Sequence, residues 1–155
     1  MSRRCGEDEG VKASLFYRTA SVLLLIFAVL HTFGFRQVDP QWGVDALIAT
    51  MRSIHFDLMG TSRSYWELFV GFGLFFSVYL LFAAVVAWQL AAMPPQGLAA
   101  MRGTAWALVV CQAAVTIVCL KYAFIVPLIF STLILVCVTV AAWLSLRVAG
   151  ASRGR

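Results

Sequence analysis

Four long runs of apolar residues alternate with short polar segments along this chain. They cover residues 13–35, 66–92, 98–120 and 127–147. A helix needs about 20 mostly apolar residues to cross the hydrocarbon core of a bilayer. Each run meets this length, and the backbone of a helix satisfies its own hydrogen bonds in lipid. We therefore predict an all-α, polytopic membrane protein with four transmembrane helices.

Local signals indicate where these helices begin and end. Ser64 and Glu67 have the spacing of a capping box directly before the second run. Segment 93–97, with two prolines and a glycine, ends that run, and Pro127 opens the fourth run at a first-turn position. Residues 1–12 are charged without apolar periodicity, so we expect a short mobile tail on the membrane surface.

The segment between the first two runs, residues 36–64, is rich in charge. Within it, Leu47, Met51, Ile54 and Leu58 recur at spacings of three and four residues. This spacing places apolar side chains on one stripe of a helix. We predict a short amphipathic helix in the first loop, lying in the membrane interface.

Small residues follow one side of the second run, at Gly73, Ser77, Ala84, Ala87 and Ala91. Their steps of three, four and seven residues form a seam on which a neighbouring helix can pack closely. The connections between the second, third and fourth runs are short, which favours antiparallel neighbours. We predict a four-helix bundle forming a single membrane domain over residues 1–155.

The composition agrees with a membrane protein and excludes two other classes. Hydrophobic residues make up 62% of the chain and charged residues 12%, whereas soluble domains have about 45–50% and about 25%. A soluble fold could not bury so much apolar surface. A disordered chain is poor in aromatic residues, and this chain has 12 Phe and 5 Trp.

The net charge of +5 reflects basic residues scattered at the ends of the apolar runs, with no basic stripe for nucleic acid. By the predicted topology, eight Lys and Arg residues lie on the side of the termini and four on the opposite side. The first group is Arg3, Arg4, Lys12, Arg18, Arg102, Arg147, Arg153 and Arg155; the second is Arg36, Arg52, Arg63 and Lys121. The positive-inside rule then predicts cytoplasmic termini and an outer segment 36–64. We expect the bacterial inner membrane.

Four cysteines, Cys5, Cys111, Cys119 and Cys137, form no Cys-x-x-Cys pair, and three of them lie within apolar runs. Thiol–disulfide exchange lacks its usual motif. The three cysteines in the apolar runs are expected to act as small packing residues.

Ionisable residues near the predicted outer interface form a candidate site. His31 closes the first run, Glu67 opens the second, and His55 and Asp57 lie on the segment between them. Such residues are costly in a membrane and call for a partner or a function. One interpretation makes Glu67 and His31 a catalytic proton-transfer pair in a partly dry pocket. The structural interpretation makes Glu67 a helix cap and His31 an interfacial side chain.

The same four side chains offer nitrogen and oxygen ligands for zinc or iron, but no His-x-x-x-His or Glu-x-x-His spacing is present. We predict no metal and no cofactor. The further candidate binding residues are His55, Asp57, Arg63, Tyr65 and Gln112. Gln112 and Thr116, and likewise Thr132 and Thr139, are expected chiefly to form hydrogen bonds between helices. The sequence has no Walker loop, Gly-x-Ser-x-Gly, His-Glu-x-x-His or Rossmann glycine motif.

Three segments carry a family resemblance: His31-Thr32-Phe33-Gly34, Ser62-Arg63-Ser64-Tyr65-Trp66 and Val70-Gly71-Phe72-Gly73-Leu74. Together they resemble a family of small bacterial four-helix membrane proteins of unknown function. The resemblance covers nearly the whole chain and implies the fold without any activity. In architecture alone, the chain is also similar to sterol-isomerase and sigma-2-like membrane proteins and to DoxX-like membrane proteins.

Three functional hypotheses remain open at this stage. The first is a membrane protein without enzymatic activity, whose outer polar cluster is a binding or assembly surface. The second is an intramembrane enzyme, or a binder of lipids or small apolar molecules, that uses Glu67 and His31. The third is a homo-oligomer or complex subunit that packs through the Gly73 and Ser77 seam.

Overall fold

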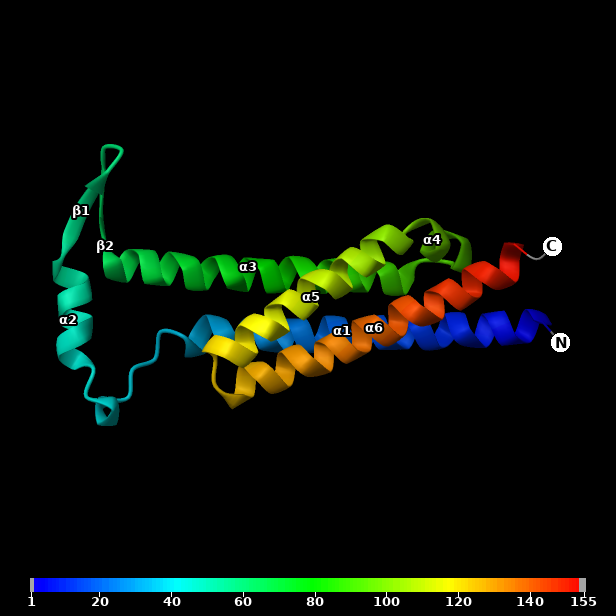
Figure 1. Ribbon diagram of the computed structural model, residues 1–155, viewed down its shortest axis with the longest axis horizontal. Helices are drawn as coiled ribbons and strands as arrows, with labels where there is room; N and C mark the ends of the chain where they lie inside the picture. Colours follow the sequence, from blue (N-terminus) through cyan, green and yellow to red (C-terminus); the bar gives the residue numbers. More distant parts are fainter. Residues whose placement is uncertain (1, 154–155) are drawn as a thin grey trace. The chain divides into compact units, whose positions relative to one another are not determined.

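The computed structural model describes the backbone of residues 2–153 and the side chains of residues 8–94 and 96–147. Four of its helices are long and apolar enough to cross a membrane. The prediction of an all-α protein with four transmembrane helices is confirmed (Figure 1). The predicted roles of Cys5, Arg3, Arg4, Arg153 and Arg155 rest on side chains outside the described residues.

The order of elements follows the predicted apolar runs, with additions in the loops. The elements are α1 (Ser2–Gly34), a 3-10 turn η1 (Pro40–Trp42), α2 (Asp45–Ser53), β1 (His55–Leu58), β2 (Thr61–Ser64), α3 (Tyr65–Ala92), α4 (Pro95–Ala100), α5 (Arg102–Tyr122) and α6 (Ile125–Arg153). Pro127 is the third residue of α6, so its predicted place in a first turn is confirmed.

Two predicted boundaries are wrong. Residues 2–12 continue α1 instead of forming a tail, because Arg, Lys and Glu are good helix formers and an established helix extends at little cost. The third long helix begins at Arg102, not at residue 98. Residues 95–100 form the separate helix α4, and Met101, at φ −88 and ψ 13, separates it from α5.

The predicted amphipathic helix is correct only in part. It is α2, but it ends at Ser53, and Ile54 has the extended values φ −80 and ψ 113. Leu58 therefore does not continue the helical stripe. It lies in β1, which pairs antiparallel with β2 in the register His55 with Ser64 and Leu58 with Thr61. The two-residue turn between these strands makes a hairpin more favourable than another helical turn.

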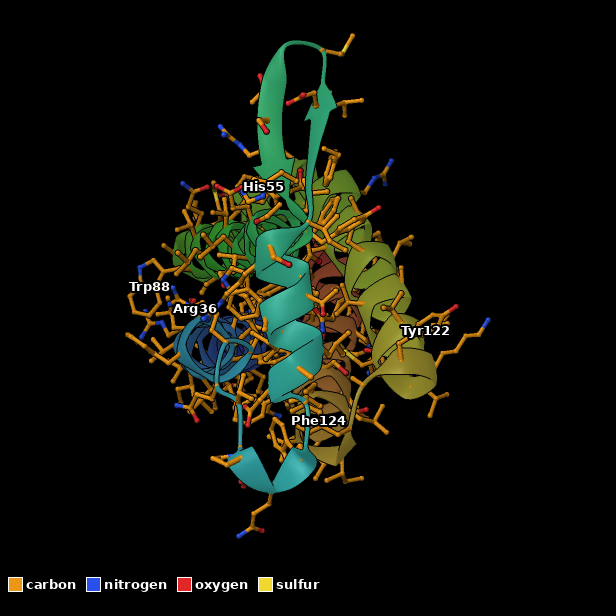
Figure 2. The ribbon with its side chains drawn as sticks, turned by 90° about the vertical axis from the view of Figure 1, so that its left-hand side faces the viewer. Arg36, His55, Trp88, Tyr122 and Phe124 are labelled. Carbon is orange, nitrogen blue, oxygen red and sulfur yellow. The ribbon has the colours of Figure 1, made fainter. Side chains whose placement is uncertain are left out.

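The chain divides into two compact units. The long-helix unit comprises Met1–Phe27 and Leu81–Arg155, and the hairpin unit comprises Ala28–Leu80. Parts of all four long helices contribute to the long-helix unit. In it, α5 and α6 run side by side (Figure 1), joined by the turn that carries Tyr122 and Phe124 (Figure 2).

The core of the long-helix unit rests on close helix contacts at small residues. Ser21 Oγ donates to the carbonyl of Ala84 at 2.8 Å, and Ser14 Oγ donates to the carbonyl of Ala91 at 2.7 Å. Ala87 is fully buried. These bonds join α1 to the seam of α3, so the predicted close approach of a neighbouring helix is confirmed here.

The hairpin unit contains the end of α1, the connecting segment with α2, the hairpin and the first part of α3. Figure 1 shows α2 and the hairpin running across the start of α3 instead of along its axis. Two side-chain contacts hold them there. The guanidinium of Arg52 lies 4.7 Å from the ring centroid of Trp66, and the rings of Phe56 and Tyr65 are 5.1 Å apart. Helix α2 and the hairpin are therefore folded against α3.

Candidate functional site

His31 lies in the last turn of α1 and is half-buried. Its Nδ1 is 3.2 Å from Ser77 Oγ of α3. Thr32 Oγ1 lies 2.8 Å from the same hydroxyl and donates to the carbonyl of Ala28 at 2.7 Å. Ser77 Oγ in turn donates to the carbonyl of Gly73 at 3.3 Å. The buried Ser77 hydroxyl thus connects two side chains of α1 to the backbone of α3.

Aromatic rings enclose His31 on two sides. Phe35 stacks on the imidazole with ring centroids 5.1 Å apart, and Phe76 meets it edge-on at 4.8 Å. Phe35 also packs over Gly73, where an added Cβ would clash with its ring. The missing side chain of Gly73 is what allows Phe35 to reach α3 beside the imidazole.

Glu67 occupies the first turn of α3 and is exposed. Its Oε2 accepts from the backbone N–H of Ser64 at 2.7 Å, while the N–H of Glu67 donates to Ser64 Oγ at 3.2 Å. These reciprocal bonds define a capping box, so that prediction is confirmed.

The structure does not bring His31 and Glu67 into contact. His31 is bonded to Ser77, which is ten residues beyond Glu67 on the same helix. At the helical rise, ten residues span about 15 Å. Direct proton transfer needs a heavy-atom separation of about 3 Å or a bridging water. The catalytic roles of His31 and Glu67 stay a prediction, and each side chain has a structural role in this geometry.

Four predicted binding residues gather at the hairpin. Cross-strand pairing puts His55 and Asp57 on one face, with Ser64 and Ser62 opposite them. Figure 2 shows His55 at the base of the hairpin, beside the end of α2. Both His55 and Arg63 lie near enough to Glu67 to interact with it electrostatically.

The other face of the hairpin combines apolar side chains with one cation. Phe56 pairs with Arg63, and Leu58 pairs with Thr61. The Tyr65 ring packs on Phe56, and Arg63 Nη1 donates to the carbonyl of Ser62 at 2.9 Å. His55, Asp57, Arg63 and Tyr65 are all exposed. His55 and Asp57 lie in β1, so their predicted place on the short loop helix is wrong. The binding role of the four residues stays a prediction.

Gln112 belongs to the core of the long-helix unit and is completely buried. Its Nε2 donates to the carbonyl of Ser131 on α6 at 3.2 Å, and Thr116 Oγ1 donates to the same carbonyl at 3.2 Å. The predicted interhelical role of this pair is confirmed. Thr132 instead bonds Leu128 of its own helix at 2.8 Å.

Sequence reasoning missed Met59 at the hairpin turn. Met59 has a φ of 50 and is followed by Gly60 with a φ of 81. Two successive positive φ values define the tight turn that matches the twist of a hairpin, and Asn-Gly is its preferred sequence. Met59 is 99% exposed. The signal available in the sequence was Gly60, two positions after a short alternation of apolar and polar residues.

Among the described residues, no group of three His, Cys, Asp or Glu side chains could hold a metal ion. No protein-family model, curated protein or solved structure matches this chain.

Proposed function

We propose that this chain is a multi-pass protein of the bacterial inner membrane, with both termini cytoplasmic, that acts by binding a protein partner through its folded outer segment 36–64. What supports a binding role is the hairpin turn, which exposes an apolar residue in an unfavourable backbone conformation. A segment that only connected two helices would need neither a hairpin nor an exposed Met59 at its turn.

Met59 has a conformational cost that folding alone does not explain. A residue with a Cβ in the left-handed region costs about 1–2 kcal/mol, and Asn or Gly would occupy it more easily. Backbone strain of this kind concentrates at functional sites. Leu58, the neighbouring residue, is 64% exposed. The turn therefore presents two apolar side chains away from any core.

The surrounding surface has the character of a protein contact. Arg36, Arg52 and Arg63 are balanced by Asp39, Asp45 and Asp57. A segment without net charge has no long-range attraction to anionic lipid. Aromatic residues, Met and Arg are enriched in protein interfaces, and the exposed Trp42, Met59 and Tyr65 contribute such side chains here.

Photo-crosslinking at the turn tests this proposal. A photoreactive amino acid replaces Thr61, the cross-strand neighbour of Leu58, and intact membranes are irradiated. We expect a discrete protein adduct, which Met59→Asn reduces at least about tenfold, the scale of an interface hot spot. Asn suits the turn, so this variant keeps the hairpin while it removes the apolar side chain.

A probe at Gln96, which is exposed in α4, serves as the control position. An adduct at twice the mass of the chain would identify the partner as a second copy. Adducts with lipid alone, or an adduct that Met59→Asn leaves unchanged, would contradict a protein contact at the turn.

The enzymatic alternative remains testable by its own variant. If Glu67 and His31 served catalysis or ligand binding, Glu67→Gln would abolish that activity while Met59→Asn would not. The observed capping box supports the structural role of Glu67.

A further inference from the structure

An open cavity of about 550 Å³ lies in the long-helix unit, and its lining contains none of the candidate site residues. It is bordered by the first part of α1, the end of α3 and α4. Its lining includes Val11, Ser14, Leu15, Arg18, Met93 and Leu98. A volume of this size is typical of small-molecule sites, which are about 300–1,000 Å³.

Arg18 is the charged side chain among these lining residues. It belongs to a helix segment that can span a membrane, Asp8–Gly34. Its guanidinium lies 5.9 Å from the ring centroid of Trp88, which orients it without neutralising its charge. Among the side chains that the structure describes, the salt bridge at this end joins Arg147 to Glu9 and does not involve Arg18. Arg18 thus keeps its hydrogen-bond donors available for an anion.

The walls beside Arg18 are apolar. Val11 and Leu15 precede it by seven and three residues, on the same face of α1, and they are 71% and 62% exposed. Leu98 forms part of the opposite wall and is buried. The hydroxyl of Ser14 already bonds the carbonyl of Ala91. The cavity therefore combines one unneutralised cation with extended apolar surface.

We propose that this cavity binds the phosphate group of an anionic phospholipid, with Arg18 contacting the phosphate and the acyl chain lying along Val11 and Leu15. A guanidinium matches phosphate oxygens with two parallel hydrogen bonds. Basic pockets between membrane helices are general sites for anionic headgroups. Free phosphate offers the same kind of oxygen acceptors but gains nothing from the apolar walls, so a lipid fits the whole cavity better.

This site is independent of the outer hairpin, and lipid binding to the purified full-length chain tests it. Native mass spectrometry from detergent micelles measures the binding of phosphatidylglycerol and phosphatidylcholine, each titrated separately. We expect phosphatidylglycerol to bind at least about tenfold more tightly, because phosphatidylcholine carries the same phosphate but also a choline cation, which the Arg18 charge repels. Arg18→Gln should remove this preference, and Arg18→Lys should keep part of it because the charge remains.

Arg102→Gln is the matched control, since Arg102 is an exposed arginine that does not line the cavity. This variant should retain the preference for phosphatidylglycerol. Equal losses in both arginine variants would overturn the proposal, because the preference would then reflect overall charge. Displacement of phosphatidylglycerol by millimolar inorganic phosphate would also overturn it in favour of a free-anion site. Circular dichroism of Arg18→Gln and Arg18→Lys checks that a lost preference is not lost folding.

Discussion

Ser64 and Glu67 form a reciprocal pair of hydrogen bonds where the hairpin meets α3. Each satisfies an N–H group of the other, at 3.2 and 2.7 Å. The first N–H groups of a helix have no partner within the helix, so this pair stabilises the start of α3 where it leaves the hairpin. Glu67 is also a candidate catalytic residue. Its bonding to Ser64 gives this carboxylate a structural role, whereas its catalytic role stays a prediction.

We predict that Ser64→Ala lowers the free energy of unfolding by about 1 kcal/mol, because it removes the cap acceptor of the Glu67 N–H group. Reversible unfolding in mixed detergent micelles, followed by circular dichroism, measures this change. Ser62→Ala is the control, since Ser62 is exposed on β2 and outside the capping box. Equal stability of the two variants would show that the cap contributes nothing.

At the scale of elements, the seam of α3 packs against α1 by two different means. In the hairpin unit, Gly73 receives the ring of Phe35 and Ser77 bonds to His31 and Thr32. In the long-helix unit, backbone carbonyls of the seam accept hydrogen bonds from serines of α1. A partner subunit could not use the Gly73 and Ser77 positions without displacing α1. An assembly contact there is therefore disfavoured, and the hairpin turn is the better candidate.

Gly73→Ala should destabilise the protein by about 1–3 kcal/mol, the usual cost of overpacking. The added Cβ meets the Phe35 ring, which cannot move freely because it also contacts the rings of His31 and Phe69. Gly71→Ala is an exact chemical match at a position with open space. It should be neutral or slightly stabilising, since Ala favours helix. Detergent unfolding of both variants decides the comparison, and equal effects would count against the close contact.

At the scale of the whole molecule, four apolar helices establish a multi-pass membrane protein. The distribution of basic residues, eight on the side of the termini and four on the other, predicts its orientation. With cytoplasmic termini, as proposed, Met59 would lie outside the cell membrane and Gln96 inside.

Single cysteines test that orientation in a variant whose native cysteines are replaced. We expect Met59→Cys to react with a membrane-impermeant maleimide in intact cells. Gln96→Cys should react only after the membrane is permeabilised. The opposite pattern would reverse the topology, and the proposed binding surface would then face the cytoplasm.

The apolar pattern alone predicted the four spans, because the length and hydrophobicity demanded by a bilayer are visible in each run. The spacing of Ser64 and Glu67 also predicted the capping box, which depends on residues only three positions apart. The end of α2 and the start of α5 were misplaced. Helix α2 ends early because the residues after it pair in the hairpin. Helix α5 begins late because the chain is interrupted at Met101, where it has no strong helix-breaking residue.

For the candidate site too, the sequence selected the residues and the tertiary structure decided most of their contacts. Sequence determined which residues are costly in a membrane, and so it selected His31, Glu67 and Gln112. Only the tertiary structure decided the partners of His31 and Gln112, because Ser77 and Ser131 lie 46 and 19 residues away from them. Hydrophobic periodicity specifies which face of a helix is buried but not which side chain of another helix meets it. That pairing is set by packing between elements, which here gives His31 and Gln112 hydrogen-bond partners on neighbouring helices.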